Sequence, residues 1–90
     1  MELRDTVSLM LSDDYRERFR AEYHQVRERV VRLHDMIEAW DAGTLDFEPT
    51  CPRHVLHGQL CAMYAYKDFL TIRAELEGVD LSDECTEQEA

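Results

Sequence analysis

Apolar residues recur at helical intervals along most of this chain. Between positions 15 and 40 they follow one another at steps of three or four residues, which places them on one face of a helix. These residues are Tyr15, Phe19, Tyr23, Val26, Val30, Leu33, Ile37 and Trp40. Ser12, followed by Asp13 and Asp14, supplies an N-cap with acids in the first turn, and Gly43 suits the left-handed turn after a helix. The pattern predicts a helix of about 27 residues that ends near Asp41 and is roughly 40 Å long.

A second helix is predicted between Pro52 and Gly78. Thr50 or Cys51 would cap it, and Pro52 fits its first turn because the missing N–H costs nothing there. Its apolar face is broad, covering about half of the circumference. The face is made by Leu56, Leu60, Met63, Tyr66, Leu70 and Ala74, widened by Val55, Ala62 and Phe69. Gly58 lies inside this pattern, either as a close backbone approach or as a tolerated surface glycine.

The short connector at 44–49 makes the two helices antiparallel neighbours, so the predicted fold class is all-α with a long αα-hairpin. Residues 1–11 carry four apolar residues at helical spacing and form a short helix or an ordered arm. The predicted organisation is therefore an arm at 1–11, a hairpin domain at 12–78 and an acidic tail at 79–90. Whether the arm packs on the hairpin is left open by the pattern.

The apolar faces are wider than the seam of one hairpin can bury. With 90 residues the chain has a thin core, and large exposed apolar patches are rare on monomers. We therefore expect a homo-oligomer in which hairpins pack on copies of themselves, with the arm helping. The alternative is an arm that folds back and covers the excess within one chain.

Composition narrows the function classes. Twenty Asp and Glu against ten Lys and Arg give a net charge of −10, which argues against broad nucleic-acid binding and against attachment to an anionic membrane. No apolar run is long enough for a membrane span, and three cysteines without CxxC spacing fit reduced thiols. We expect a cytoplasmic protein without a cofactor.

Arginines border the aromatic stripe of the first helix. Arg27 and Arg29 have no acid three or four residues away, so the helix does not balance their charge. Arginine beside aromatic rings offers a fork for phosphate oxygens and a surface that stacks on bases. A cleft between subunits, lined by Tyr15, Arg18 and Arg29, would bind a small phosphorylated ligand. The competing interpretation is that the arginines pair across the seam with Glu75 or Glu77.

Other polar residues carry less chemistry. His54, His57 and Cys61 share a helix face with Asp68, but one helix cannot supply a closed tetrahedral metal site, so we expect an exposed polar face and no metal. His24 and His34 stand near no evident nucleophile, and no phosphate-binding glycine loop occurs. We expect no catalytic residues and no enzyme.

Several short motifs resemble a known group of proteins. They run from Asp14-Tyr15-Arg16-Glu17-Arg18-Phe19 through Trp40-Asp41-Ala42-Gly43 and Cys51-Pro52 to Glu77-Gly78. Over roughly residues 14 to 81 the chain is similar to small crAssphage-related proteins of phages and mobile elements. These resemble in turn the phage sponges that block CBASS immunity by holding cyclic nucleotides between subunits. The resemblance implies that Tyr15 and Arg29 face a ligand, with arginine standing where those sponges carry lysine.

Together these observations favour a phage or prophage anti-defence protein of the host cytoplasm that sequesters a nucleotide signal between subunits without catalysis. Tyr15 would stack on a base, and Arg18 and Arg29 would bind phosphates. Arg27 and Arg73 are further candidates for ligand binding, and the alternative for Arg73 is a boundary residue that pairs with Glu77, four residues on. The alternative is an acidic interaction module that inhibits a host defence protein, with its tail imitating nucleic-acid charge.

Overall fold

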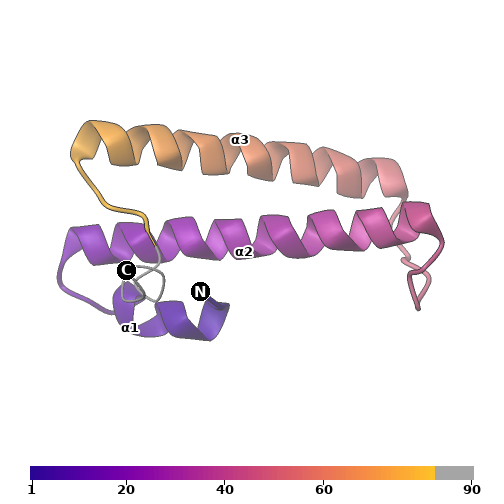
Figure 1. Ribbon diagram of the computed structural model, residues 1–90, viewed down its shortest axis with the longest axis horizontal. Coiled ribbons are helices and arrows are strands. Elements are labelled where there is room, and N and C mark those ends of the chain that lie inside the picture. Colours follow the sequence, from indigo (N-terminus) through magenta and orange to yellow (C-terminus); the bar gives the residue numbers. More distant parts are fainter. Residues whose placement is uncertain (83–90) are drawn as a thin grey trace.

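The structure is a computed structural model that describes residues 1–82, and it contains helices and connecting segments but no strand in that range (Figure 1). A 3-10 turn, η1 (Leu3–Thr6), leads into the short helix α1 (Val7–Met10). The long helices α2 (Tyr15–Ala42) and α3 (Arg53–Glu77) follow and lie antiparallel. The all-α hairpin with a short N-terminal helix is thus confirmed. No helix within residues 1–82 is long and apolar enough to cross a membrane.

The helix ends follow the local signals of the sequence with small shifts. Asp14 is the N-cap of α2, where its carboxylate accepts a hydrogen bond of 2.9 Å from the backbone N–H of Arg16. Ser12, which the sequence suggested as the N-cap, lies two residues earlier, and its hydroxyl accepts from the N–H of Asp14. Gly43 and Gly78 end the two helices with φ of 76° and 72°, the left-handed conformation that glycine adopts without strain.

The second helix begins later than the sequence suggests. Its N-cap is Pro52, with no side-chain hydrogen bond, and α3 starts at Arg53. The expected caps Thr50 and Cys51 therefore lie outside the helix. Arg53 instead forms a two-pronged ion pair with Asp41 at the end of α2, with distances of 2.8 and 2.7 Å, and this pair joins the helix ends across the connector.

The core lies along the seam between α2 and α3. Phe19 and Leu70 are almost completely buried, and Ala74 packs beside them in the same cluster. The remaining buried members are Val26, Val30, Ile37, Leu60 and Val79. All but the last belong to the two predicted stripes.

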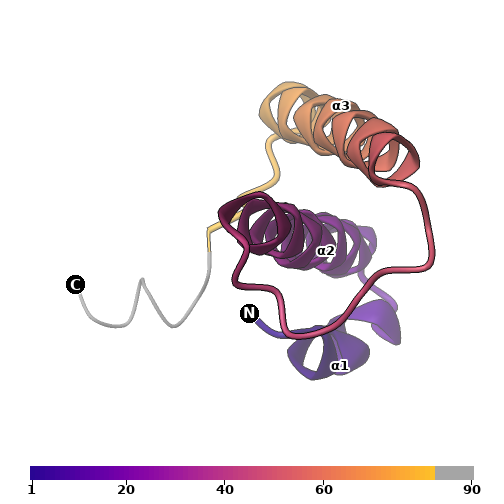
Figure 2. The ribbon, with the colours of Figure 1, turned by 90° about the vertical axis from the view of Figure 1, so that its right-hand side faces the viewer.

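The N-terminal arm folds back onto α2, so that in the end-on view α2 lies between α3 and α1 (Figure 2). Thr6 fastens it: this side chain is 1% exposed, its hydroxyl donates to the carbonyl of Leu3 at 2.7 Å, and it accepts from Nε2 of Gln25 at 2.9 Å. The alternative prediction, in which the arm folds back onto its own chain, is therefore correct for the surface of α2. No contact between elements joins the arm to α3 in the described part of the chain.

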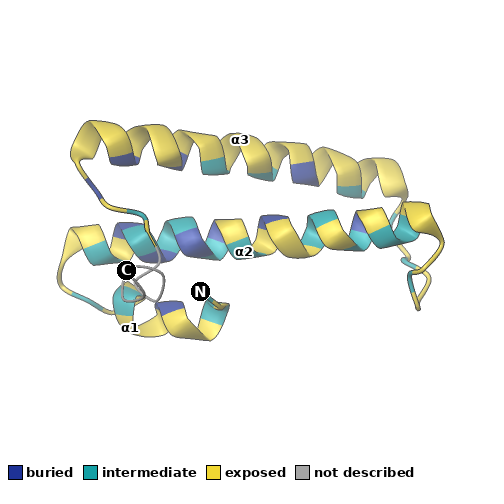
Figure 3. Cartoon of the chain, viewed as in Figure 1, coloured by how far each residue is buried: buried dark blue, intermediate teal, exposed yellow. Residues whose placement is uncertain are grey.

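The outward face of α3 consequently stays open. Most of this face is exposed (Figure 3). It includes the apolar residues Phe69, which is 65% exposed, and Leu76, which is 81% exposed. The arm thus covers part of the excess apolar surface but leaves the part on α3.

Packing continues beyond the boundary expected at Gly78. Val79 is buried and Leu81 packs against the core, so the first residues assigned to the acidic tail belong to the hairpin. The rest of that tail, from residue 83 onward and including Cys85, lies outside the described residues.

Candidate ligand-binding site

At the end of the hairpin where α2 begins and α3 ends, four side chains form a cluster that we call the Tyr15 cluster: Tyr15, Phe19, Arg73 and Glu77. The hydroxyl of Tyr15 donates to Oε1 of Glu77 at 2.7 Å and accepts from Nη2 of Arg73 at 3.0 Å. Arg73 also pairs with Glu77 at 3.4 Å, and its guanidinium carbon lies 4.8 Å from the centre of the Phe19 ring. The structure therefore brings together two predicted ligand residues, Tyr15 and Arg73.

Hydrogen bonds between α2 and α3 shift the pKa values of side chains in and beside the Tyr15 cluster. The hydrogen bond from Tyr15 lowers the pKa of Glu77 below its ordinary value of 4.5; Arg73 adds to this effect and desolvation opposes it. Next to the cluster, the hydroxyl of Tyr66 donates to the Glu22 carboxylate, and this bond is the main cause of the raised pKa of Tyr66. Both contacts join α2 to α3, so the tyrosines on this side fasten the two helices together. Glu77 pairs with Arg73 of its own helix, as their spacing of four residues predicts, and it also accepts the hydrogen bond from Tyr15 across the seam. The alternative pairing of Glu77 with arginines of α2 is not seen among the described ion pairs.

Further along the same side of the hairpin lies a pocket of about 400 Å³, which we call the Arg29 groove. Its walls are mainly apolar, and three polar side chains stand among them. It is lined by Leu3, Arg29, Arg32, Leu33, Met36, Leu56, Gln59 and Met63. Because Leu3 belongs to the arm, folding of the arm onto α2 completes the groove.

The two arginines of this groove differ in their partners. Nε of Arg32 donates to Oε1 of Glu28 at 2.9 Å, an ion pair within the helix. Arg29 is exposed and makes no ion pair or side-chain hydrogen bond within residues 1–82. The imbalance noted in the sequence persists in the fold, so Arg29 is free to bind an anion at the groove.

The remaining predicted arginines lie elsewhere. Nη1 of Arg18 donates to the carbonyl of Ser12 at 2.7 Å, so this side chain supports the loop before α2. Arg27 is two residues from Arg29 and therefore about 160° away around the helix, on the opposite side of α2. Tyr15 and Arg29 are separated by about 21 Å along the helix, so one chain does not join them in a single cleft.

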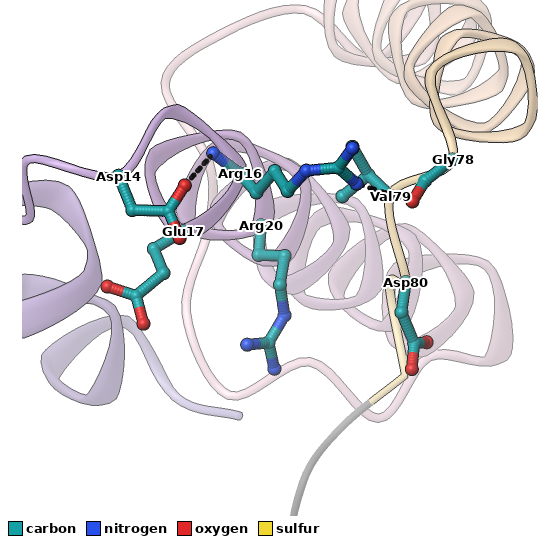
Figure 4. A pocket seen from close by; sticks show the side chains of 7 residues that line it. All are labelled: Asp14, Arg16, Glu17, Arg20, Gly78, Val79 and Asp80. Carbon is teal, nitrogen blue, oxygen red and sulfur yellow. Dashed lines mark hydrogen bonds between the residues drawn. The ribbon is translucent and has the colours of Figure 1, made fainter.

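A second pocket, of about 300 Å³, lies where the segment after α3 passes the start of α2 (Figure 4). Nη1 of Arg16 donates to the carbonyl of Gly78 at 2.6 Å, and Nη2 of Arg20 donates to the carbonyl of Ser82 at 3.3 Å. The pocket also contains three carboxylates, from Asp14, Glu17 and Asp80. Because the arginines already bind backbone oxygens and the acids outnumber them, this pocket secures the C-terminal segment and is poorly suited to an anionic ligand. That Arg16 and Arg20 hold the segment after α3 could not be predicted from the sequence.

His57 and His34 make close contacts with neighbours on their own helices. Sγ of Cys61 lies 3.9 Å from Nδ1 of His57, one helical turn away. On α2, ligand atoms of His34, Asp35 and Glu38 lie within 4.8 Å of one another, but all three come from little more than one turn of a single helix, and only His34 is partly buried. Such ion-pair groups are common on helix surfaces, and we assign no metal to them.

Comparison with protein families matches residues 13–76 to the family Sequestin. No curated protein and no solved structure matches the chain. The matched region spans both long helices and includes the Tyr15 cluster except Glu77, together with every residue of the Arg29 groove except Leu3.

Proposed function

Because this chain belongs to the Sequestin family, whose members are non-catalytic sequestering proteins, we propose that it captures a nucleotide immune signal and withholds it without chemical change. The proposal makes it an anti-defence protein of a phage or prophage that acts on a cyclic nucleotide signal of the CBASS kind. Capture takes place between copies of the chain.

The single observation that carries this proposal is Arg29 in the lining of a mainly apolar groove. Ligand sites combine apolar walls with a few polar groups that fix orientation, and the Arg29 groove has that composition. A guanidinium without a carboxylate partner offers its donors to phosphate oxygens, while the methionine and leucine walls suit the faces of a base. Gln59 adds an amide that both donates and accepts.

The Tyr15 cluster supplies a second contact surface on the same side. Gln59, Tyr66 and Arg73 follow one another at steps of seven residues, so they lie along one side of α3 from the groove to the cluster. Tyr15 as a residue is 47% exposed, which leaves area for stacking on a base. Arg73 remains partly exposed above Phe19 and contributes positive charge there.

The proposal is tested by isothermal titration calorimetry with a panel of cyclic di- and trinucleotides. We expect at least one to bind, and the variant Arg29→Ala to bind it roughly 10- to 150-fold more weakly, the loss of a charged hydrogen-bonding partner worth about 1.5–3 kcal/mol. Arg27→Ala is the matched control, since it removes the same charge from the opposite side of the same helix, and it should bind nearly as well as the wild type.

Two results would contradict the proposal. If no cyclic nucleotide of the panel produced heat or a thermal shift, nucleotide capture would be wrong and the alternative of a protein-binding module would be favoured. If Arg27→Ala weakened binding as much as Arg29→Ala, the effect would reflect general charge rather than the groove.

A further inference from the structure

The outward face of α3 carries a second apolar stripe that the hairpin core does not use. Seven residues at alternating steps of three and four lie along it, and every one is exposed. They are Val55, Gly58, Ala62, Ala65, Phe69, Ile72 and Leu76. None of them is polar, although the chain as a whole is 33% charged. We call this set the outer stripe.

Residue sizes along the outer stripe are divided between its two halves. The N-terminal half contains the small residues Gly58 and Ala62, whereas the C-terminal half contains the large residues Phe69 and Ile72. If a second copy of α3 is laid antiparallel with Ala65 facing its own counterpart, Phe69 faces Ala62, Ile72 faces Gly58 and Leu76 faces Val55. Every large side chain then meets a smaller one, as close packing of two helices requires. A parallel pairing would instead place Phe69 on Phe69 and leave gaps at the small residues.

The polar residues beside the stripe agree with the same register. A row of residues flanks the outer stripe on each side, and we call these two rows its borders. In an antiparallel pair, residues of one border face residues of the same border on the partner. On one border Glu75 then faces His54 and His57, and Asp68 faces Cys61. The other border places Arg73 opposite Gln59. No pair of like charges meets in this register, which matters for a chain of net charge −10.

The geometry points to a two-fold symmetric dimer in which the outer stripes of two copies pack antiparallel through α3, with the axis beside Ala65. Such an interface is isologous, so one self-complementary face is sufficient to close it. The axis is perpendicular to the helices, and the same side of both hairpins therefore lies on one face of the dimer. That face carries both Arg29 grooves and both Tyr15 clusters.

The dimer also has a consequence for ligand capture, which rests on the proposed function. Arg73 of one copy lies opposite the partner's Gln59, a lining residue of the partner's Arg29 groove. The Tyr15 cluster of one copy thereby adjoins the Arg29 groove of the other, although about 21 Å of helix separates them within one chain. A nucleotide at this junction would contact both copies.

The interface is tested first by sedimentation velocity of the protein without ligand, from about 1 μM to about 1 mM. We expect a dimer for the wild type and for Thr71→Glu, which adds a charge to an exposed position of α3 outside the outer stripe. Ala65→Glu places two carboxylates at the axis and should raise the dissociation constant at least about tenfold. A monomeric wild type over the whole range, or an Ala65→Glu variant that dimerises as well as Thr71→Glu, would overturn the interface.

A crosslinking experiment tests the direction of the helices. In a background with the three native cysteines replaced by serine, Ala65→Cys lies at the axis and should form a disulfide-linked dimer under mild oxidation. Ala62→Cys faces Phe69 of the partner, and the two introduced thiols are then too far apart to join. Equal crosslinking at both positions would indicate parallel helices and overturn the register. Neither experiment contains a nucleotide, so their failure is distinguishable from failure of ligand capture.

Discussion

Thr6 is the residue through which the arm can be released without disturbing the hairpin. In Thr6→Val the shape is nearly kept, but the hydrogen bonds to the Leu3 carbonyl and from the Gln25 amide are lost. Each such bond contributes about 0.5–1.5 kcal/mol net, so the packed arm should lose about 1–3 kcal/mol relative to the open arm. In equilibrium terms this is roughly a 5- to 150-fold increase in the population of the open arm.

Amide hydrogen exchange measures that population directly. The N–H of Leu11 donates to the carbonyl of Val7 at 3.2 Å, so its protection reports the arm. The amide of Leu70, in the middle of α3, reports the hairpin. We expect Thr6→Val to reduce protection of Leu11 by roughly 5- to 150-fold and to leave that of Leu70 nearly unchanged.

The control for this experiment is Ser8→Ala, a change at an exposed position of the same arm. It should leave both amides as they are in the wild type. Unchanged protection of Leu11 in Thr6→Val would show that the hydroxyl does not fasten the arm. An equal loss of protection at Leu11 and Leu70 would show that arm and hairpin unfold together. Either result would contradict the role given to Thr6, which is to fasten the arm separately from the hairpin.

Three further predictions concern stability and titration. Leu70→Ala, at an almost fully buried position, should lower the free energy of unfolding by about 2–5 kcal/mol in urea titrations, and a loss below 1 kcal/mol would contradict the described core. Gly78→Ala should lower the free energy of unfolding by about 1–2 kcal/mol, because Gly78 has a positive φ that alanine adopts only with strain. Gly58→Ala should instead stabilise the monomer by about 0.5–1 kcal/mol, since Gly58 is helical and no atom lies within 4 Å of the added carbon. Equal effects of the two substitutions would argue against these backbone conformations. Tyr15→Phe should raise the pKa of Glu77 toward 4.5 in a carboxylate NMR titration. Because the pKa of Glu77 is lowered in the folded state, the contact stabilises the fold while Glu77 is ionised, and this stability is lost as the pH falls through the folded-state pKa. An unchanged pKa of Glu77 in Tyr15→Phe would contradict the hydrogen bond.

The hairpin could be predicted from the sequence because its signals are local. The apolar spacing from Tyr15 to Trp40 marks one helix face, and Gly43 and Gly78 mark the two helix ends. These features depend on residues a few positions apart, and the structure has both glycines in the left-handed conformation. The start of α3 was less certain because Thr50, Cys51 and Pro52 all resemble caps.

The candidate site was only partly predictable, since it depends on how distant segments meet. Arg29 could be selected because no acid lies three or four residues from it along the helix, and no ion pair to Arg29 is found among the described residues. The contribution of Leu3 to the groove could not be foreseen, because it depends on the arm folding back through Thr6. Likewise, the pair of Arg73 with Glu77 follows from their spacing along one helix, whereas the hydrogen bond from Tyr15 to Glu77 depends on how the two helices meet.

We propose that the protein holds a nucleotide and releases it unchanged. To measure this, the protein is saturated with a cyclic nucleotide that binds it, the free nucleotide is removed, the protein is denatured by heat, and the mass and amount of the released nucleotide are determined. We predict recovery of the whole bound amount at its original mass. A hydrolysed or otherwise altered product would contradict sequestration, as would the absence of any retained nucleotide.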